Sequence, residues 1–291
     1  MKTVKLNTLP LPTFESLGVN YVVRKVDTFD KEKISPSNGS IDITHDTSCT
    51  ITAAQGESKS LIQYICSRAS LQLDTYVKAE NGTNITIIQV FDSEKPVISR
   101  LQADIADNAS FELRQLYIGG RDTVSEIVSE LYGRCAQFCA DIAYTLDNAD
   151  KIDLNLIANH YGKKSESKIN VGGILKGKSD KLFKGTIDFK SGASGSKGTE
   201  VEDVLLLGQE VRSRTVPVIL CSEEDVAGSH GATEGRMDDK KVFYLRSRGL
   251  SEEDIMRLMS KAKLSRVING IGDEQAVRRI YDSLGWGETN E

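Results

Sequence analysis

The segments Ser110-Phe-Glu-Leu-Arg-Gln-Leu-Tyr117 and Gln137-Phe-Cys-Ala-Asp-Ile-Ala-Tyr144 begin 27 residues apart and repeat one pattern. In each of them apolar side chains recur at every second position, which is typical of a β-strand. Asn84-Ile-Thr-Ile-Ile-Gln-Val-Phe91 and Lys151-Ile-Asp-Leu-Asn-Leu-Ile157 have the same strand-like composition. The middle of the chain is therefore expected to consist of short strands.

A small turn motif recurs between these strands, at Glu80-Asn-Gly82, Asp107-Asn-Ala109 and Asp147-Asn-Ala149. Asparagine tolerates the left-handed backbone conformation that such turns require. The separations of 27 and 40 residues are close to two and three units of about 13, as in a solenoid of stacked coils. Signals for two-residue hairpins are scarce, which favours crossover connections. The pattern predicts a right-handed parallel β-helix, with an evenly spaced β-sandwich as the alternative.

The pattern changes to a helical one after Gly249. Ser251 is a typical N-cap and is followed by acidic residues. One helical stripe of apolar residues follows: Ile255, Leu258, Met259, Ala262, Val267 and Ile268. A second helix is expected over residues 273–284. Such helices either cap the last coil or dock a partner.

These patterns divide the chain into two parts. Residues 1–249 are expected to form the β-helix core, with a less regular part over 1–50 that includes a polar loop at 31–39. A second polar loop is expected at 188–199. Residues 250–291 form the helical segment.

The composition excludes several classes of function. The chain has 291 residues, a net charge of −5 and 6% aromatic residues, which argues against nucleic-acid binding. No apolar stretch of signal-peptide length occurs at the N-terminus, and the longest aliphatic run, Val204–Leu207, is far shorter than the roughly 20 residues that span a bilayer. Five irregularly spaced cysteines fit a reducing compartment. We expect a soluble cytoplasmic protein that does not bind membranes.

Candidate chemistry is concentrated near residue 221. The sequence contains no nucleotide-binding loop and no nucleophile motif, so neither a bound nucleotide nor a catalytic residue is expected. Cys221 and His230 are nine residues apart at the end of a strand-like run, and thiolate and imidazole are ligands for iron. Most single cysteines are simply small buried side chains. One thiol and one imidazole do not complete a metal site, but a two-fold dimer can supply the rest.

The other cysteines and histidines are interpreted as structural. Ala136 and Phe138 are expected to face the core, which puts Cys135 and Cys139 on the other face of one strand, about 13 Å apart. His160 is expected near a turn, either on the surface or hydrogen-bonded. Cys49, Cys66 and His45 have no informative context.

Two longer segments resemble a known family. Asp225-Val-Ala-Gly-Ser-His-Gly-Ala-Thr-Glu-Gly235 and Phe243-Tyr-Leu-Arg-Ser-Arg-Gly-Leu250 are similar to the signature of the SufB/SufD family of iron–sulfur cluster assembly proteins. The resemblance extends upstream through Leu205–Leu207, Thr215–Pro217 and Phe183–Ile187. It implies a parallel β-helix, pairing of two subunits through that β-helix, and a nascent cluster near the dimer interface.

The resemblance also implies a role for the chain. It would be a non-enzymatic assembly scaffold that holds an iron–sulfur cluster transiently, as a homodimer or as a heterodimer with a paralogue. ATP hydrolysis would occur in a SufC-like ABC ATPase that docks on the C-terminal helices. Ile255, Leu258, Met259 and Ala262 are the partner-binding residues predicted on this basis.

Several positions depart from the family pattern. The chain resembles a short form without the long N-terminal helical region. SufB-type members carry a cysteine just before the Thr-x-Pro segment, where residues 210–214 contain no thiol, and a glutamate at the position of Gly231. SufD-type members often have a cysteine at the position of Gly228. Cys221 is therefore the predicted cluster ligand, with His230 second and Glu234 third.

Two other functions remain as alternatives. One is a metal-free β-helix scaffold that only regulates the ATPase. The other is a β-helix carbohydrate-active enzyme, which usually presents paired carboxylates and exposed aromatic residues along a groove. A single tryptophan and the absence of a secretion signal make this second alternative a poor fit.

Overall fold

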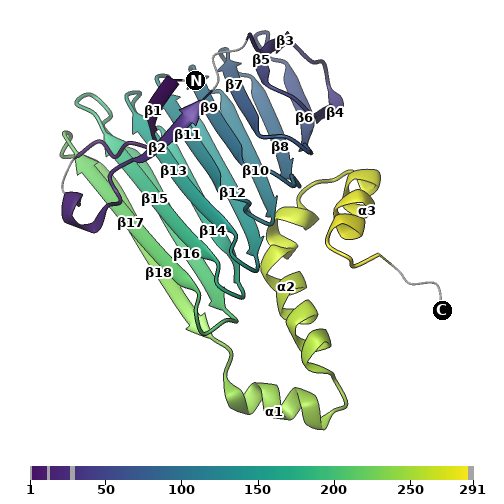
Figure 1. Cartoon of the computed structure of the whole chain (residues 1–291). Coiled ribbons are helices and arrows are strands. Elements are labelled where there is room, and N and C mark those ends of the chain that lie inside the picture. Colours follow the sequence, from purple (N-terminus) through teal and green to yellow (C-terminus); the bar gives the residue numbers. More distant parts are fainter. Residues whose placement is uncertain (1, 12–13, 27–29, 288–291) are drawn as a thin grey trace.

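The strands form two eight-stranded parallel sheets that face each other (Figure 1). This computed structural model describes residues 2–11, 14–26 and 30–287. Even-numbered strands make one sheet, in the order β4 to β18, and odd-numbered strands make the other, in the order β3 to β17. Successive strands therefore alternate between the even sheet and the odd sheet, and the chain winds into a solenoid of about seven turns. The predicted parallel β-solenoid is confirmed.

In both sheets the strands become longer toward the C-terminal end. The even sheet contains β4 (Gly39–Ile43), β6 (Ser58–Ile65), β8 (Asn84–Phe91), β10 (Ser110–Ile118), β12 (Gln137–Leu146), β14 (Glu166–Leu175), β16 (Ser196–Leu206) and β18 (Val226–Arg236). The odd sheet contains β3 (Glu32–Ile34), β5 (Thr47–Ala53), β7 (Leu71–Ala79), β9 (Val97–Ile105), β11 (Thr123–Leu131), β13 (Lys151–His160), β15 (Asp180–Phe189) and β17 (Arg212–Cys221).

The repeat in the sequence corresponds to one coil. Phe111 lies opposite Phe138 and Tyr117 lies opposite Tyr144 in the register of β10 and β12. The two phenylalanine rings stack with centroids 5.7 Å apart. Identical residues 27 positions apart therefore stack in the core between the two sheets, where their burial stabilises the fold.

A ladder of buried glutamines runs through the same core. The amide of Gln89 donates to Gln63 Oε1 at 2.7 Å, and the amide of Gln115 donates to Gln89 Oε1 at 2.7 Å. Tyr117 then donates its hydroxyl proton to Gln115 Oε1 at 2.9 Å. The four side chains are fully buried. Each of these hydrogen bonds therefore offsets part of the desolvation of the two side chains that it joins.

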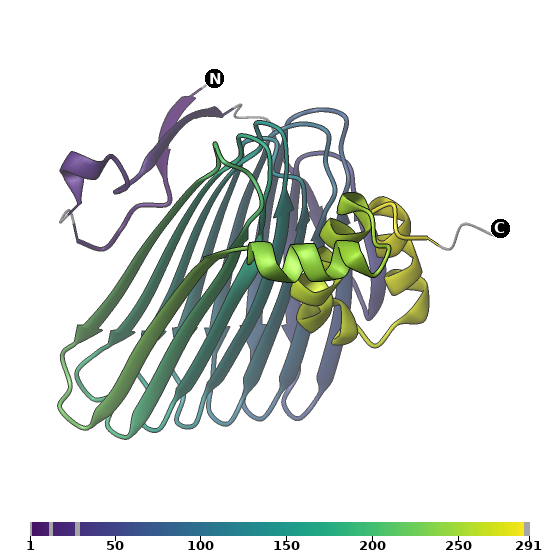
Figure 2. The same ribbon diagram turned by 90° about the horizontal axis from the view of Figure 1, so that it is seen from below.

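Three helices follow the solenoid: α1 (Asp239–Ser247), α2 (Glu252–Asn269) and α3 (Glu274–Ser283). α2 begins with a capping box between Ser251 and Asp254, at the predicted position. The C-terminal helices lie beside the β-solenoid (Figure 2). Apolar side chains of α2 and α3, such as Leu264 and Ile280, pack on Leu116 and other residues of the outer face of the even sheet. α1 was not predicted and lies inside the range assigned to the β-helix. Among the described residues, no helix is long and apolar enough to cross a membrane.

The N-terminal part covers the outer face of the odd sheet. A hairpin of β1 (Lys2–Leu6) and β2 (Val22–Val26) is followed by β3, which lies entirely within the stretch 31–39 that we expected to be a loop. That expectation was wrong, because residues 32–34 pair with β5. The expected loop 188–199 is also shorter than predicted, because β15 runs to Phe189 and β16 starts at Ser196.

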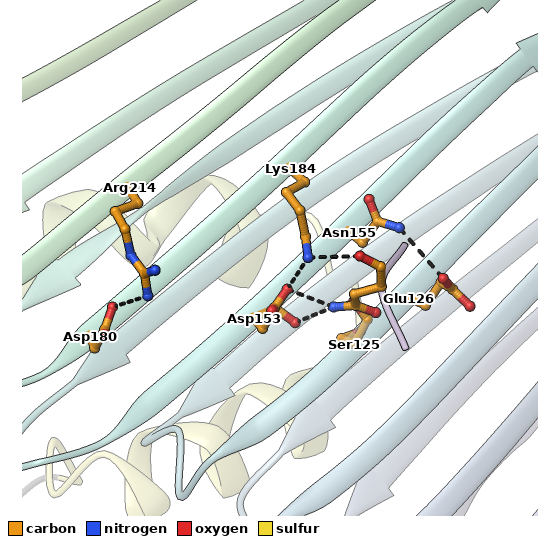
Figure 3. A network of polar contacts seen from close by, with 8 residues as sticks. Ser125, Glu126, Asp153, Asn155, Asp180, Lys184 and Arg214 are labelled. Carbon is orange, nitrogen blue, oxygen red and sulfur yellow. Dashed lines mark hydrogen bonds and ion pairs between the residues drawn. The ribbon is translucent and has the colours of Figure 1, made fainter. Parts of the chain in front are cut away.

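A buried ion pair lies under the N-terminal segment. Lys184 Nζ is 2.9 Å from Asp153 Oδ1, and it donates to the backbone oxygen of Asn7 at 2.8 Å (Figure 3). Asn7 in turn donates its side-chain amide to Asp153 and to the backbone oxygen of Ser125. This polar network fixes the segment to the odd sheet.

Candidate functional site at the last coil

The last coil ends the solenoid with two free strand edges. β17 and β18 are the terminal strands of the odd and even sheets, and no described strand pairs with their outer edges. Cys221 is the last residue of β17, and His230 and Glu234 lie in β18. All three side chains are exposed. The predicted ligands therefore lie on one open end of the molecule.

The facing positions of the two strands separate the thiol from the imidazole. A Cβ on Gly228 would lie 3.1 Å from Ile219 Cγ2, so these two residues face each other. Cys221 and His230 are each two residues away from this facing pair, in opposite directions. Their backbone positions are therefore about 13 Å apart along the strands, at roughly 3.3 Å per residue. One metal ion cannot bind both side chains of a single chain.

Glu234 lies further along β18, where its carboxylate accepts a hydrogen bond from Ser213 of β17. Cys221, His230 and Glu234 thus lie in a line rather than around a point. Within the part of the chain that the structure describes, no three His, Cys, Asp or Glu side chains could hold a metal ion together.

A charged core lies directly beneath the last coil. The ammonium group of Lys181 donates to Glu202 Oε1 at 2.6 Å and to Thr215 Oγ1 at 3.0 Å, and neither Lys181 nor Glu202 has more than 1% of its side chain exposed. Burial lowers the pKa of Lys181, and the nearby Glu202 carboxylate opposes this shift. Both charges are therefore compensated inside the solenoid.

Glu200 is a second buried carboxyl group of β16, and sequence reasoning missed it. Its side chain is 3% exposed, and burial together with Glu202 raises its pKa to about 7. The carboxyl group occupies the space over Gly185, where a Cβ would lie 1.9 Å from Glu200 Oε2. A glycine at position 185 therefore makes room for this side chain. The sequence did contain one signal for this position: side chains alternate between the two faces of β16, which places Glu200 on the same face as Val204.

His160 is buried in the core at the end of β13. Its Nδ1 and Nε2 atoms lie 2.7 and 2.8 Å from the hydroxyl oxygens of Ser165 and Ser167. Its ring is also in contact with Phe189, with centroids 4.8 Å apart. Burial lowers the pKa of His160 to about 4, so the ring is neutral at pH 7. The hydrogen-bonded alternative is confirmed, and the surface alternative was wrong.

Of the two central cysteines, only Cys135 differs from its expected placement. Ala136 and Phe138 face the core as predicted, and Cys139 lies half-buried in β12. Burial raises the pKa of the Cys139 thiol. Cys135, however, lies in the turn before β12 with a φ of 54°, so its expected strand position was wrong. Cys135 thus has a left-handed backbone conformation in the turn that connects β11 to β12.

The predicted partner-binding residues have different exposures. Ile255 is fully buried within its own chain, Met259 is half-buried, and Leu258 and Ala262 are exposed. α1 adds two further exposed residues, Phe243 with 75% and Tyr244 with 55% exposure. Apolar side chains are therefore presented to solvent by both α1 and α2.

Comparison with known proteins identifies the family of the chain. Residues 43–263 match the SufBD core domain of the SUF system for FeS cluster assembly. The chain belongs to this SufBD family. The matched range contains the whole last coil, α1 and most of α2.

Curated relatives carry the same family name. The chain is 29% identical to the iron–sulfur cluster assembly protein SufD of Bacillus subtilis (strain 168), over 163 residues that are 56% of this chain and 37% of SufD. It is 31% identical over 112 residues to SufD of Escherichia coli (strain K12), covering 38% of this chain and 26% of that protein. With the chloroplastic SufBD family protein ABCI8 of Arabidopsis thaliana the identity is 25% over 181 residues, covering 62% and 30%. The matched part of the SufBD chain thus covers between 26% and 37% of the length of these relatives.

Proposed function

We propose that this SufBD protein is a non-enzymatic scaffold that holds a nascent iron–sulfur cluster as cargo. It would work as a dimer together with a SufC-like ABC ATPase, which would hydrolyse the ATP. The observation that carries the proposal is the open last coil, where an exposed thiol and an exposed imidazole lie on unpaired strand edges. Thiolate and imidazole are the side chains that ligate iron–sulfur clusters.

The geometry of the last coil supports a dimer. Cys221 and His230 are about 13 Å apart along the strands, so a shared cluster needs donors from a second subunit. The free edges of β17 and β18 offer unpaired backbone groups to such a partner. A homodimer and a heterodimer with a paralogue both fulfil this requirement.

The exposed apolar residues of α1 and α2 support docking of the ATPase. Aromatic residues are enriched at protein interfaces, and Phe243, Tyr244 and Leu258 are largely exposed here. Ile255 is excluded from direct contact by its burial. The double variant Phe243→Ser/Leu258→Ser should lose most ATPase binding in a pull-down, whereas Tyr76→Ser, an exposed change on the odd sheet, should not. Undiminished binding by the double variant would refute this docking surface.

Anaerobic incubation with iron and sulfide, followed by gel filtration, tests the scaffold function itself. Wild-type protein should elute with bound iron and acid-labile sulfide. The second candidate is a metal-free scaffold that only regulates the ATPase, and it is favoured by the lack of three converging donors among the described residues. ATPase binding without any bound cluster would support that candidate instead.

A further inference from the structure

We propose that the loop between β1 and β2 forms an arm that packs on a second copy of this chain. The arm consists of residues 9–11 and 14–20, and it includes the short 3-10 helix η1 (Glu15–Leu17). The inference rests on the dimer of the proposed function and adds a contact outside the two strand edges. The arm of each copy would lie against the outer face of the other copy's odd sheet.

The first observation is the position of the arm at the open end of the odd sheet. Leu9 and Val19 of the arm are buried in one cluster with two residues of the sheet. These are Leu182 of β15 and Val216 of β17, the terminal strand. The arm lies beside β17 in Figure 1, at the end of the sheet where no described strand follows. Neighbouring strands are about 4.8 Å apart, so a strand of a second copy next to β17 would lie within reach of the arm.

The second observation is that the arm presents apolar side chains to solvent. Leu11 is 44% exposed and Leu17 is 64% exposed. Among the described residues eleven large apolar side chains are exposed, and the first 26 residues contain four of them. Single exposed leucines are common, but such a concentration on one short segment indicates a surface that a partner covers.

The strand edge alone offers a second copy an incomplete hydrogen-bond ladder. Arg212 and Ser222 donate their backbone amides to the backbone oxygens of Ser179 and Phe189, on the side of β15. Backbone groups alternate between the two sides of a strand, so the odd-numbered residues of β17 direct theirs to the open side. Pro217, in the centre of β17, has no N–H to donate there. Contacts outside the edge are therefore needed to stabilise a dimer, and the arm supplies them.

Charge complementarity indicates that the partner is a second copy. β17 begins at Arg212, and the acidic residues Glu223, Glu224 and Asp225 follow its other end. Arg212 and Glu224 are exposed, and neither forms an ion pair with another described residue. A two-fold axis perpendicular to the strands makes two β17 edges antiparallel, so the basic end of each copy meets the acidic end of the other. The edge is therefore complementary to itself, as a two-fold dimer requires.

The dimer dissociation constant of the full chain, measured by analytical ultracentrifugation, tests the arm. The double variant Leu11→Ser/Leu17→Ser should weaken the dimer roughly 10–100-fold, because it removes two apolar anchors from the interface. Val23→Ser is the matched control and should dimerise like wild type. Val23 is 47% exposed on β2, and its neighbour Arg24 pairs with Asp122 near β11, away from β17. Equal dissociation constants of the double variant and wild type would overturn the inference, as would a wild type that is monomeric at every concentration.

Photo-cross-linking provides a second readout that leaves the arm intact. A p-benzoylphenylalanine residue at position 17 should join two chains into a covalent dimer that survives denaturing electrophoresis. The same residue at position 23 should leave the chains monomeric. Monomer at both positions would contradict the contact between the arm and a second copy.

A charge exchange tests the identity of the partner. Arg212→Glu and Glu224→Arg should each weaken the dimer, because each places like charges at both ends of the paired edges. A chain that carries both substitutions should dimerise like wild type. A double variant that remains as weak as the single variants would refute the proposed pairing of two copies.

Cluster reconstitution on the same proteins separates this inference from the proposed function. A wild-type dimer that the arm variant does not weaken, together with a bound cluster, refutes the arm and leaves the scaffold function intact. A dimer that depends on the arm, without any cluster in wild type, keeps the arm and refutes the cluster scaffold.

Discussion

Lys184 is completely buried and forms an ion pair of 2.9 Å with Asp153 on the outer face of the odd sheet (Figure 3). The pair lies beneath the N-terminal segment, where the backbone oxygen of Asn7 accepts a hydrogen bond from the same ammonium group. Burial lowers the pKa of Lys184, and Asp153 opposes this shift. The pair thus links the N-terminal segment energetically to the solenoid.

Replacing Lys184 by methionine should destabilise the protein. The change keeps the aliphatic stem and removes the charge, so that Asp153 loses its buried partner, and the free energy of unfolding should fall by about 3 kcal/mol. Denaturant unfolding measures the loss. Lys178→Met is the matched control, because Lys178 pairs with Glu210 in an exposed ion pair and should contribute less than about 1 kcal/mol. Equal effects of the two substitutions would contradict the role of the buried pair.

Stability should depend on pH through His160. The pKa of this residue is about 4 in the folded protein and about 6.5 in the unfolded chain. Between these values the unfolded chain binds a proton that the folded protein does not. The contribution of His160 to stability is therefore fully present above pH 6.5 and is lost as the pH falls toward 4, by about 3 kcal/mol in total.

His160→Gln isolates this contribution, because glutamine does not titrate. The stability difference between wild type and variant, measured by urea unfolding at several pH values, should favour wild type less at pH 4.5 than at pH 7. A difference that is constant over this range would show that the histidine is not buried in its neutral form.

Interrupting the glutamine ladder should also be costly. Gln89→Leu removes the central member and leaves the amide groups of Gln63 and Gln115 without their partner, so we expect a loss of about 1–3 kcal/mol in unfolding free energy. Gln102→Leu on the exposed face of β9 serves as the control and should change stability by less than about 0.5 kcal/mol. A Gln89 variant as stable as this control would mean that the ladder does not contribute.

The sequence carried enough information for the solenoid because its core residues repeat with the coil. Phe111 and Phe138 are stacked in the structure, and the turn asparagines Asn108 and Asn148 have φ values of 53° and 52°. α1 was missed because the apolar run at residues 242–245 also fits a strand. In the structure Asp238 is the N-cap residue of α1, because its side chain accepts a hydrogen bond from the backbone amide of Lys240.

The candidate site was predictable only in part. Cys221 and His230 were identified from their chemistry. Their spacing in the sequence could not show that they lie on strands of different sheets, far apart along those strands. Glu200 was missed because β16 has polar residues on both faces: the alternation groups Glu200 with Val204 but does not tell that this face is the buried one. The helical stripe likewise could not show that Ile255 packs inside the chain while Leu258 remains exposed.

The most direct test of the cluster-scaffold account is the iron and acid-labile sulfide content of anaerobically reconstituted wild type, Cys221→Ser and Cys139→Ser. Cys139 is a matched control because it is a half-buried thiol of β12, away from the last coil. We expect wild type and Cys139→Ser to retain a cluster and Cys221→Ser to lose most of it. Equal iron and sulfide content in wild type and Cys221→Ser would contradict the assignment of the last coil as the cluster site.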